Sequence, residues 1–136
     1  MSYDLRIVNN ETYEPVMLPE KHQFRGGTFA IGGTPDASFN ITYNYGQFYY
    51  DHLDKDKGLR GIYGKPLPEA LSMLKKAIEE IKAKYPEVLG DDPPGADDYW
   101  ASTPFNAMKA LEALIAITKM VMESGVPVDD LTWEGD

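Results

Sequence analysis

The spacing of hydrophobic residues changes near the middle of the chain. From residue 1 to 66, apolar and polar positions mostly alternate, which is the period of a strand with one buried face. The clearest run is 37–45, which is rich in the aromatic and β-branched residues that favour strands. The face expected to be buried carries Phe39, Ile41, Tyr43 and Tyr45. The opposite, polar face carries Ser38, Asn40, Thr42 and Asn44.

Shorter elements complete this first half. Alternation over residues 3–8 predicts one strand, and residues 13–17 predict a second short strand at an edge or a bulge. Glycine pairs on both sides of 28–31 mark a third strand, which we expect to form a hairpin with 37–45. Residues 48–53 predict a turn or two of helix.

From residue 67 onward the apolar spacing becomes helical. A period of 3.6 residues after Pro68 predicts an amphipathic helix that Pro86 ends. A second helix begins after the N-cap Thr103 and ends near Gly125. Apolar residues cover most of its circumference, so this helix either carries the core or forms a subunit interface of a homo-oligomer. We favour the core, because a small α+β domain needs one element to carry it.

These elements predict an α+β fold in a single domain. A small antiparallel sheet from residues 1–66 packs against the two main helices of residues 67–125, which an acidic loop rich in proline and glycine joins. Residues 126–136 are expected to form a short acidic tail. The chain length of 136 residues suits one domain and leaves no room for a second independent core.

The charge is strongly negative but unevenly distributed. With 13 Lys and Arg against 22 Asp and Glu, the net charge is −9, which disfavours a broad grip on nucleic acid or on an anionic membrane. Residues 87–98 contribute five acids without a base, and residues 123–136 contribute five more. Removing those ten charges from −9 leaves +1 for the rest of the chain. The strand-rich half therefore has room for one anionic ligand, whereas the loop and the tail suit a basic protein partner.

The sequence contains no recognisable catalytic or metal-binding motif. It has no cysteine, which excludes disulfides, thiolate catalysis and zinc–sulfur sites. The two histidines, His22 and His52, are isolated from each other, and no acidic run has the ligand pattern of an EF-hand. We therefore expect no catalytic residues, no metal and no cofactor. The N-terminus also lacks a signal peptide, which together with the absence of cysteine favours a cytoplasmic location.

The polar face of the strand 37–45 is the first candidate binding site. Asn40, Thr42 and Asn44 would form a row of hydrogen-bonding groups on a rigid platform, with Tyr45 beside them for stacking. Such a surface suits a small polar or nucleotide-like ligand, and Lys65 would neutralise a phosphate. The alternative is a solvent-exposed sheet face above an aromatic core.

A second candidate surface precedes and follows the second helix. Tyr99 and Trp100 stand just before its start, Asn106 lies in its first turn, and Trp133 lies in the tail. Aromatic residues of this kind are enriched at protein-binding hot spots. The alternative is that Tyr99 and Trp100 pack on the core as a hydrophobic staple. For Trp133 we favour the interpretation that it folds back to secure the terminus.

Several short segments resemble those of small phage and prophage proteins. The resemblance rests on Asn40–Tyr45, Ile62–Lys65, Asp97–Trp100 with Thr103 and Asn106, and Trp133–Asp136. That group has no assigned activity, so the resemblance implies only a setting, an accessory protein inside a bacterial host.

Three classes of function remain open. The first is a non-enzymatic accessory protein that binds a small polar ligand, with sequestration of a host immune signal as one purpose. The second is an acidic inhibitor that binds a host protein. The third is an enzyme with a dispersed site.

Overall fold

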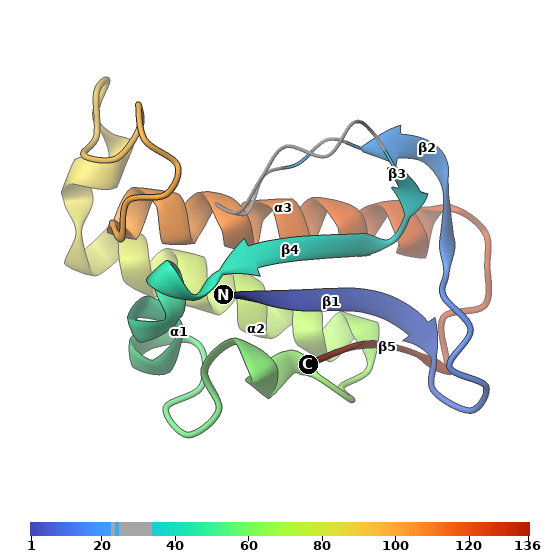
Figure 1. The fold of residues 1–136 in the computed structure, drawn as a ribbon. Helices are drawn as coiled ribbons and strands as arrows, with labels where there is room; N and C mark the ends of the chain where they lie inside the picture. The colour runs from blue at the N-terminus through green and yellow to red at the C-terminus, as the bar shows by residue number, and fades with distance from the viewer. Residues whose placement is uncertain (23, 25–33) are drawn as a thin grey trace.

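A three-stranded antiparallel sheet packs against the helices of the C-terminal half (Figure 1). The computed structural model describes residues 1–22, 24 and 34–136. Strand β1 (Ser2–Asn9) lies in the centre of the sheet, between β4 (Ser38–Thr42) and β5 (Leu131–Gly135). The predicted α+β class is confirmed.

Alternation along β1 sets the face of the sheet that joins the core. Tyr3, Leu5 and Ile7 are buried, as the two-residue period predicts. Leu5 lies opposite Phe39 of β4 in the antiparallel register, so both strands direct large apolar side chains to the same side. The other face of the sheet carries short polar and charged residues, among them Asp4 opposite Asn40.

The two long helices form where the sequence predicts them. Helix α2 (Leu67–Lys84) starts with a proline in its first turn and buries one apolar stripe. Helix α3 (Pro104–Glu123) follows the N-cap Thr103, whose side chain accepts a hydrogen bond from the Asn106 N–H. Ten of the twenty residues of α3 are buried, so this helix belongs to the core, as favoured above.

The first half contains less strand than the sequence predicts. β4 ends at Thr42, after which the chain turns through the 3₁₀ helix η1 (Tyr43–Tyr45) into the short helix α1 (Gly46–His52). The Thr42 hydroxyl causes this change, because it accepts a hydrogen bond from the Asn44 N–H and caps η1. The strand predicted over 28–31 lies outside the described residues.

The second strand also lies later in the chain than predicted. β2 (Met17–His22) begins where the expected strand 13–17 ends, and it pairs with β3 (Thr34–Asp36). Proline at position 15 allows only an isolated bridge to Val8. Two further 3₁₀ helices, η2 (Gly58–Ile62) and η3 (Pro86–Leu89), connect the helices.

The expected acidic tail is part of the sheet. Residues 131–135 form β5, which pairs with β1, and Trp133 is 0% exposed. Its Nε1 donates a hydrogen bond of 3.0 Å to the Thr118 hydroxyl of α3. The interpretation that Trp133 folds back is therefore confirmed, whereas its predicted role as a partner contact fails, because a buried indole has no surface to offer.

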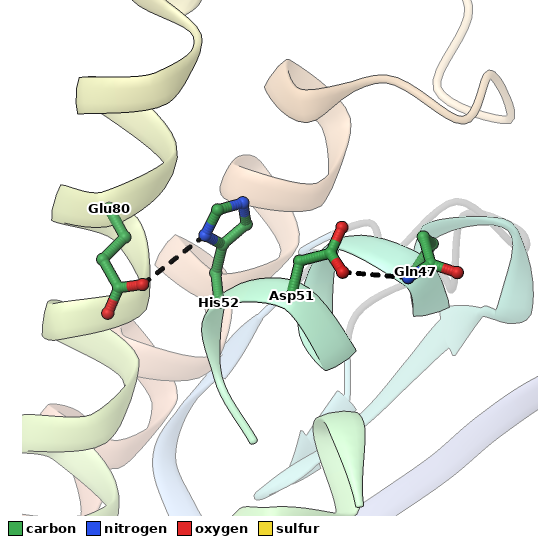
Figure 2. Close-up of polar contacts among 4 residues, drawn as sticks. All are labelled: Gln47, Asp51, His52 and Glu80. Carbon is green, nitrogen blue, oxygen red and sulfur yellow. Dashed lines mark hydrogen bonds and ion pairs between the residues drawn. The ribbon is translucent and has the colours of Figure 1, made fainter. Parts of the chain in front are cut away.

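Helix α1 docks on α2 through an imidazole (Figure 2). The His52 side chain is only 8% exposed, and its Nδ1 lies 3.5 Å from the Glu80 carboxylate. The ring meets Tyr85 edge-on, with centroids 6.0 Å apart. On the outer side of α1, Gln47 donates a hydrogen bond to Asp51. His52 therefore packs between α1 and α2, within the short helix predicted over 48–53.

The buried bond between Trp133 and Thr118 can be tested by removing its acceptor. Thr118→Val keeps the shape of the side chain but leaves the indole N–H unpaired in the core. We expect the free energy of unfolding to fall by about 1–3 kcal/mol, measured by urea denaturation with far-UV circular dichroism. In a Trp133→Phe background the same change should cost less, because no indole N–H remains. Equal costs in the two backgrounds would contradict this role of the bond.

Candidate functional site

The segment around Asn44 and the loop around Trp100, which were predicted as two separate sites, meet at one end of α3. The Asn44 side chain donates a hydrogen bond of 2.9 Å to the Trp100 carbonyl. The Tyr45 hydroxyl donates to the carbonyl of Tyr99. These bonds tie η1 to the loop before α3, although the residues are more than fifty positions apart in the chain.

Asn106 fixes the same loop from the side of α3. Its side-chain amide donates to the Asp98 carbonyl at 2.8 Å and to the Ala101 carbonyl at 3.0 Å. Gly95 packs so closely that a Cβ at this position would lie 2.8 Å from the Asn106 amide nitrogen, and its φ of +90° favours glycine. The loop therefore holds one defined shape against the first turn of α3.

A groove of about 470 Å³ lies between this loop, η1 and one face of α3. We call it the α3 groove. It is mostly apolar, and four of its lining side chains are aromatic. Among the described residues it is lined by Phe24, Tyr45, Ala96, Tyr99, Phe105, Asn106, Lys109, Glu112, Ala113 and Ala116. The size is typical of a site for a small molecule.

The polar groups of the α3 groove are few and mostly engaged. Lys109 and Glu112 form an ion pair of 3.1 Å on the rim. Burial, together with smaller effects of the nearby Asp98 carboxylate and of Tyr99, raises the pKa of the Tyr45 hydroxyl to about 12. Tyr45 therefore stays a neutral phenol that donates its proton to the loop at any ordinary pH.

Tyr45, Tyr99 and Asn106 are the predicted site residues that line the α3 groove. Asn44 does not line the groove, but it holds the loop through its hydrogen bond to the Trp100 carbonyl. Trp100 is 43% exposed, and its ring lies tilted against that of Tyr99, with centroids 5.7 Å apart.

The predicted row of polar side chains along one strand face does not form. Thr42 is 2% exposed and caps η1. Asn40 lies on the outer face of the sheet, where its amide donates to Ser2 and to the Asp4 carboxylate. Lys65 immediately precedes Pro66, which bridges to β5, and it does not line the α3 groove. The row fails because β4 ends at Thr42, before the second asparagine.

Most of the groove lining lies outside the residues predicted as sites. Phe105, Lys109, Glu112, Ala113 and Ala116 lie on one face of α3, at spacings of three, four and seven residues. The helix carries alanine at positions 107, 110, 113 and 116, and of these Ala113 and Ala116 line the groove. The groove-lining face could not be recognised in the sequence, because apolar residues cover most of the circumference of this helix.

Neither a metal site nor a membrane-spanning helix is found in the part of the chain that the structure describes. Within residues 1–22, 24 and 34–136, no three His, Asp or Glu side chains gather closely enough to hold a metal ion. None of the helices formed by these residues combines the length and apolar character needed to cross a membrane.

The loop can be tested through Asn106. Asn106→Ala removes two hydrogen bonds that hold residues 98–101, so we expect a loss of about 1–3 kcal/mol in unfolding free energy. Hydrogen exchange of the backbone amides of residues 98–101 should become faster. Asn9→Ala is the control, because Asn9 caps a distant turn. Unchanged exchange in the loop of Asn106→Ala would show that Asn106 does not hold it.

No family model matches the chain, and no curated protein or solved structure matches it either. The resemblance to small phage and prophage proteins stays a prediction. A function for this protein must therefore be proposed from the geometry of the α3 groove.

Proposed function

We propose that the protein is a non-enzymatic binding protein that holds a small planar ligand in the α3 groove. The observation that carries this proposal is the shape and lining of the groove: a hollow of about 470 Å³ with aromatic walls. Flat apolar surfaces of a ligand gain affinity by stacking on such walls. The phage resemblance implies an accessory protein inside a bacterial host, and sequestration of a host molecule is the purpose that belongs to this proposal.

Hydrogen bonds and core packing hold both walls of the groove in place. Three side chains hold its loop wall, through hydrogen bonds from Asn44, Tyr45 and Asn106 to backbone carbonyls. The opposite wall is a helix anchored in the core by Leu111, Leu114 and other buried residues. A preformed site of this kind avoids the entropic cost of ordering loops on binding.

Filling the groove from within tests this proposal. Ala116→Trp places an indole in the groove at a helical position that is only partly buried, so the helix itself should tolerate it. We expect adenosine, indole or 2-naphthylmethanol to shift groove amides in ¹⁵N–¹H NMR spectra of the natural protein. The variant should lose about tenfold or more in affinity for the probes that bind, equivalent to about 1.4 kcal/mol.

Lys76→Trp is the matched control, because it adds the same side chain to an exposed position of α2 outside the groove. This control should bind the probes like the natural protein. The proposal is wrong if none of the three probes shifts the groove amides, or if Ala116→Trp binds them as tightly as the control.

A second candidate function rests on Trp100. This large aromatic side chain is 43% exposed and stands beside the exposed carboxylates of Asp97 and Asp98. An exposed tryptophan within an acidic segment suits a protein partner with a basic surface and an apolar pocket. We therefore propose, as the alternative, an inhibitor that binds a host protein through this loop.

Affinity capture from bacterial lysate tests the alternative. Trp100→Ala should lose basic proteins that the natural protein retains, because truncating a hot-spot tryptophan typically costs about 2 kcal/mol or more. Tyr13→Ala removes an exposed aromatic side chain from a different loop and should retain them. Equal capture by both variants would remove Trp100 as an anchor.

A further inference from the structure

We propose that the α3 groove selects an amine-bearing organic cation: a flat apolar body that carries a protonated amine. This inference rests on the proposed function and names the chemical class of its ligand. It follows from the balance of hydrogen-bond donors and acceptors in the groove, from its charge, and from its aromatic walls.

The side chains of Tyr45 and Asn106, the buried polar residues of the groove lining, have no free hydrogen-bond donor and can only accept. Both N–H groups of the Asn106 amide are used by the carbonyls of Asp98 and Ala101. Its oxygen has no hydrogen-bond partner among residues 1–22, 24 and 34–136, and it remains an acceptor. The Tyr45 hydroxyl likewise donates its proton to Tyr99 and leaves its oxygen lone pairs as acceptors.

The ligand must therefore supply the hydrogen atoms. A protonated amine carries up to three N–H donors and no acceptor, which complements the oxygens of Tyr45 and Asn106. A phosphate or a carboxylate offers only acceptors, so it would leave both oxygens unpaired and lose its own hydration.

The local charge favours the same class of ligand. The one basic side chain of the described lining, Lys109, already faces the Glu112 carboxylate at 3.1 Å. Asp98 lies close enough to Tyr45 to affect the pKa of its hydroxyl, and the adjacent Asp97 is also exposed. An anion entering the groove meets this acidic loop, whereas a cation is attracted to it.

Aromatic walls strengthen this preference. Tyr45 and Phe105 line the groove from η1 and α3, and Phe24, which follows β2 in the chain, lines it as well. The π electrons of such rings attract cations, and the attraction increases when water is excluded. This chemistry replaces the expected nucleotide site, in which Lys65 would have met a phosphate.

Three probes that share one skeleton separate the effect of charge from that of shape. 2-Naphthylmethylamine, 2-naphthylmethanol and 2-naphthoate carry a positive charge, no charge and a negative charge at neutral pH. We expect the amine to bind tightest and the carboxylate weakest, with about tenfold or more between them, in NMR titrations at low salt. Ala116→Trp should abolish the binding of the amine.

Each result decides between the two proposals. If the alcohol binds in the groove and the amine binds no more tightly, the charge selection is overturned and the proposed function stands. If no probe shifts the groove amides, both proposals are overturned. If the amine binds equally well to Ala116→Trp, its site is elsewhere and the inference fails.

Glu112→Gln provides a second, independent test. Removing this carboxylate frees the Lys109 ammonium and makes the rim more positive. The affinity for the amine should fall severalfold relative to that for the alcohol. Glu79→Gln is the matched control, because Glu79 forms the same kind of exposed pair with Lys82 on α2. An amine-to-alcohol affinity ratio that is the same in both variants would contradict the proposal.

Discussion

The contact between Trp133 and α3 is the interaction on which the rest of the structure depends. Trp133 is fully buried, and its indole N–H bonds to the Thr118 hydroxyl. Because β5 pairs with the central strand β1, this one side chain fixes the sheet against the helix that carries the core. The face of α3 that is not covered by the sheet or by α2 is then free to form one wall of the groove.

The other wall of the groove depends on hydrogen bonds between segments far apart in the chain. Asn44 and Tyr45 come from the turn after β4, and Asn106 comes from the first turn of α3. All three direct their donors to carbonyls of residues 98–101, which fixes the loop. Both Tyr45 and Asn106 line the groove, and the same bonds leave their side-chain oxygens as acceptors. The hydrogen bonds that fix the loop are therefore also the basis of the proposed preference for an amine.

Helices and strands of this protein could be predicted better than the site. The apolar period, Pro68 and the cap Thr103 were enough to place α2 and α3 within a few residues. The polar row was predicted wrongly, because local hydrogen bonding by Thr42 ends the strand before the row is complete. The convergence of Asn44 with Trp100 could not be predicted either, since it arises from tertiary packing between the two halves. The chemistry of the side chains was enough to predict Tyr45, Tyr99 and Asn106 as site residues. It assigned them to two separate sites, whereas they line one groove.

The most direct test is an isotope-filtered NOE experiment on the protein saturated with 2-naphthylmethylamine. Contacts from the naphthyl protons to the methyl groups of Ala113 and Ala116 and to the ring of Phe105 are predicted, because these side chains line the groove. Contacts to residues around Asn40 on the outer face of the sheet, and none to α3, would contradict the assignment of the α3 groove as the binding site.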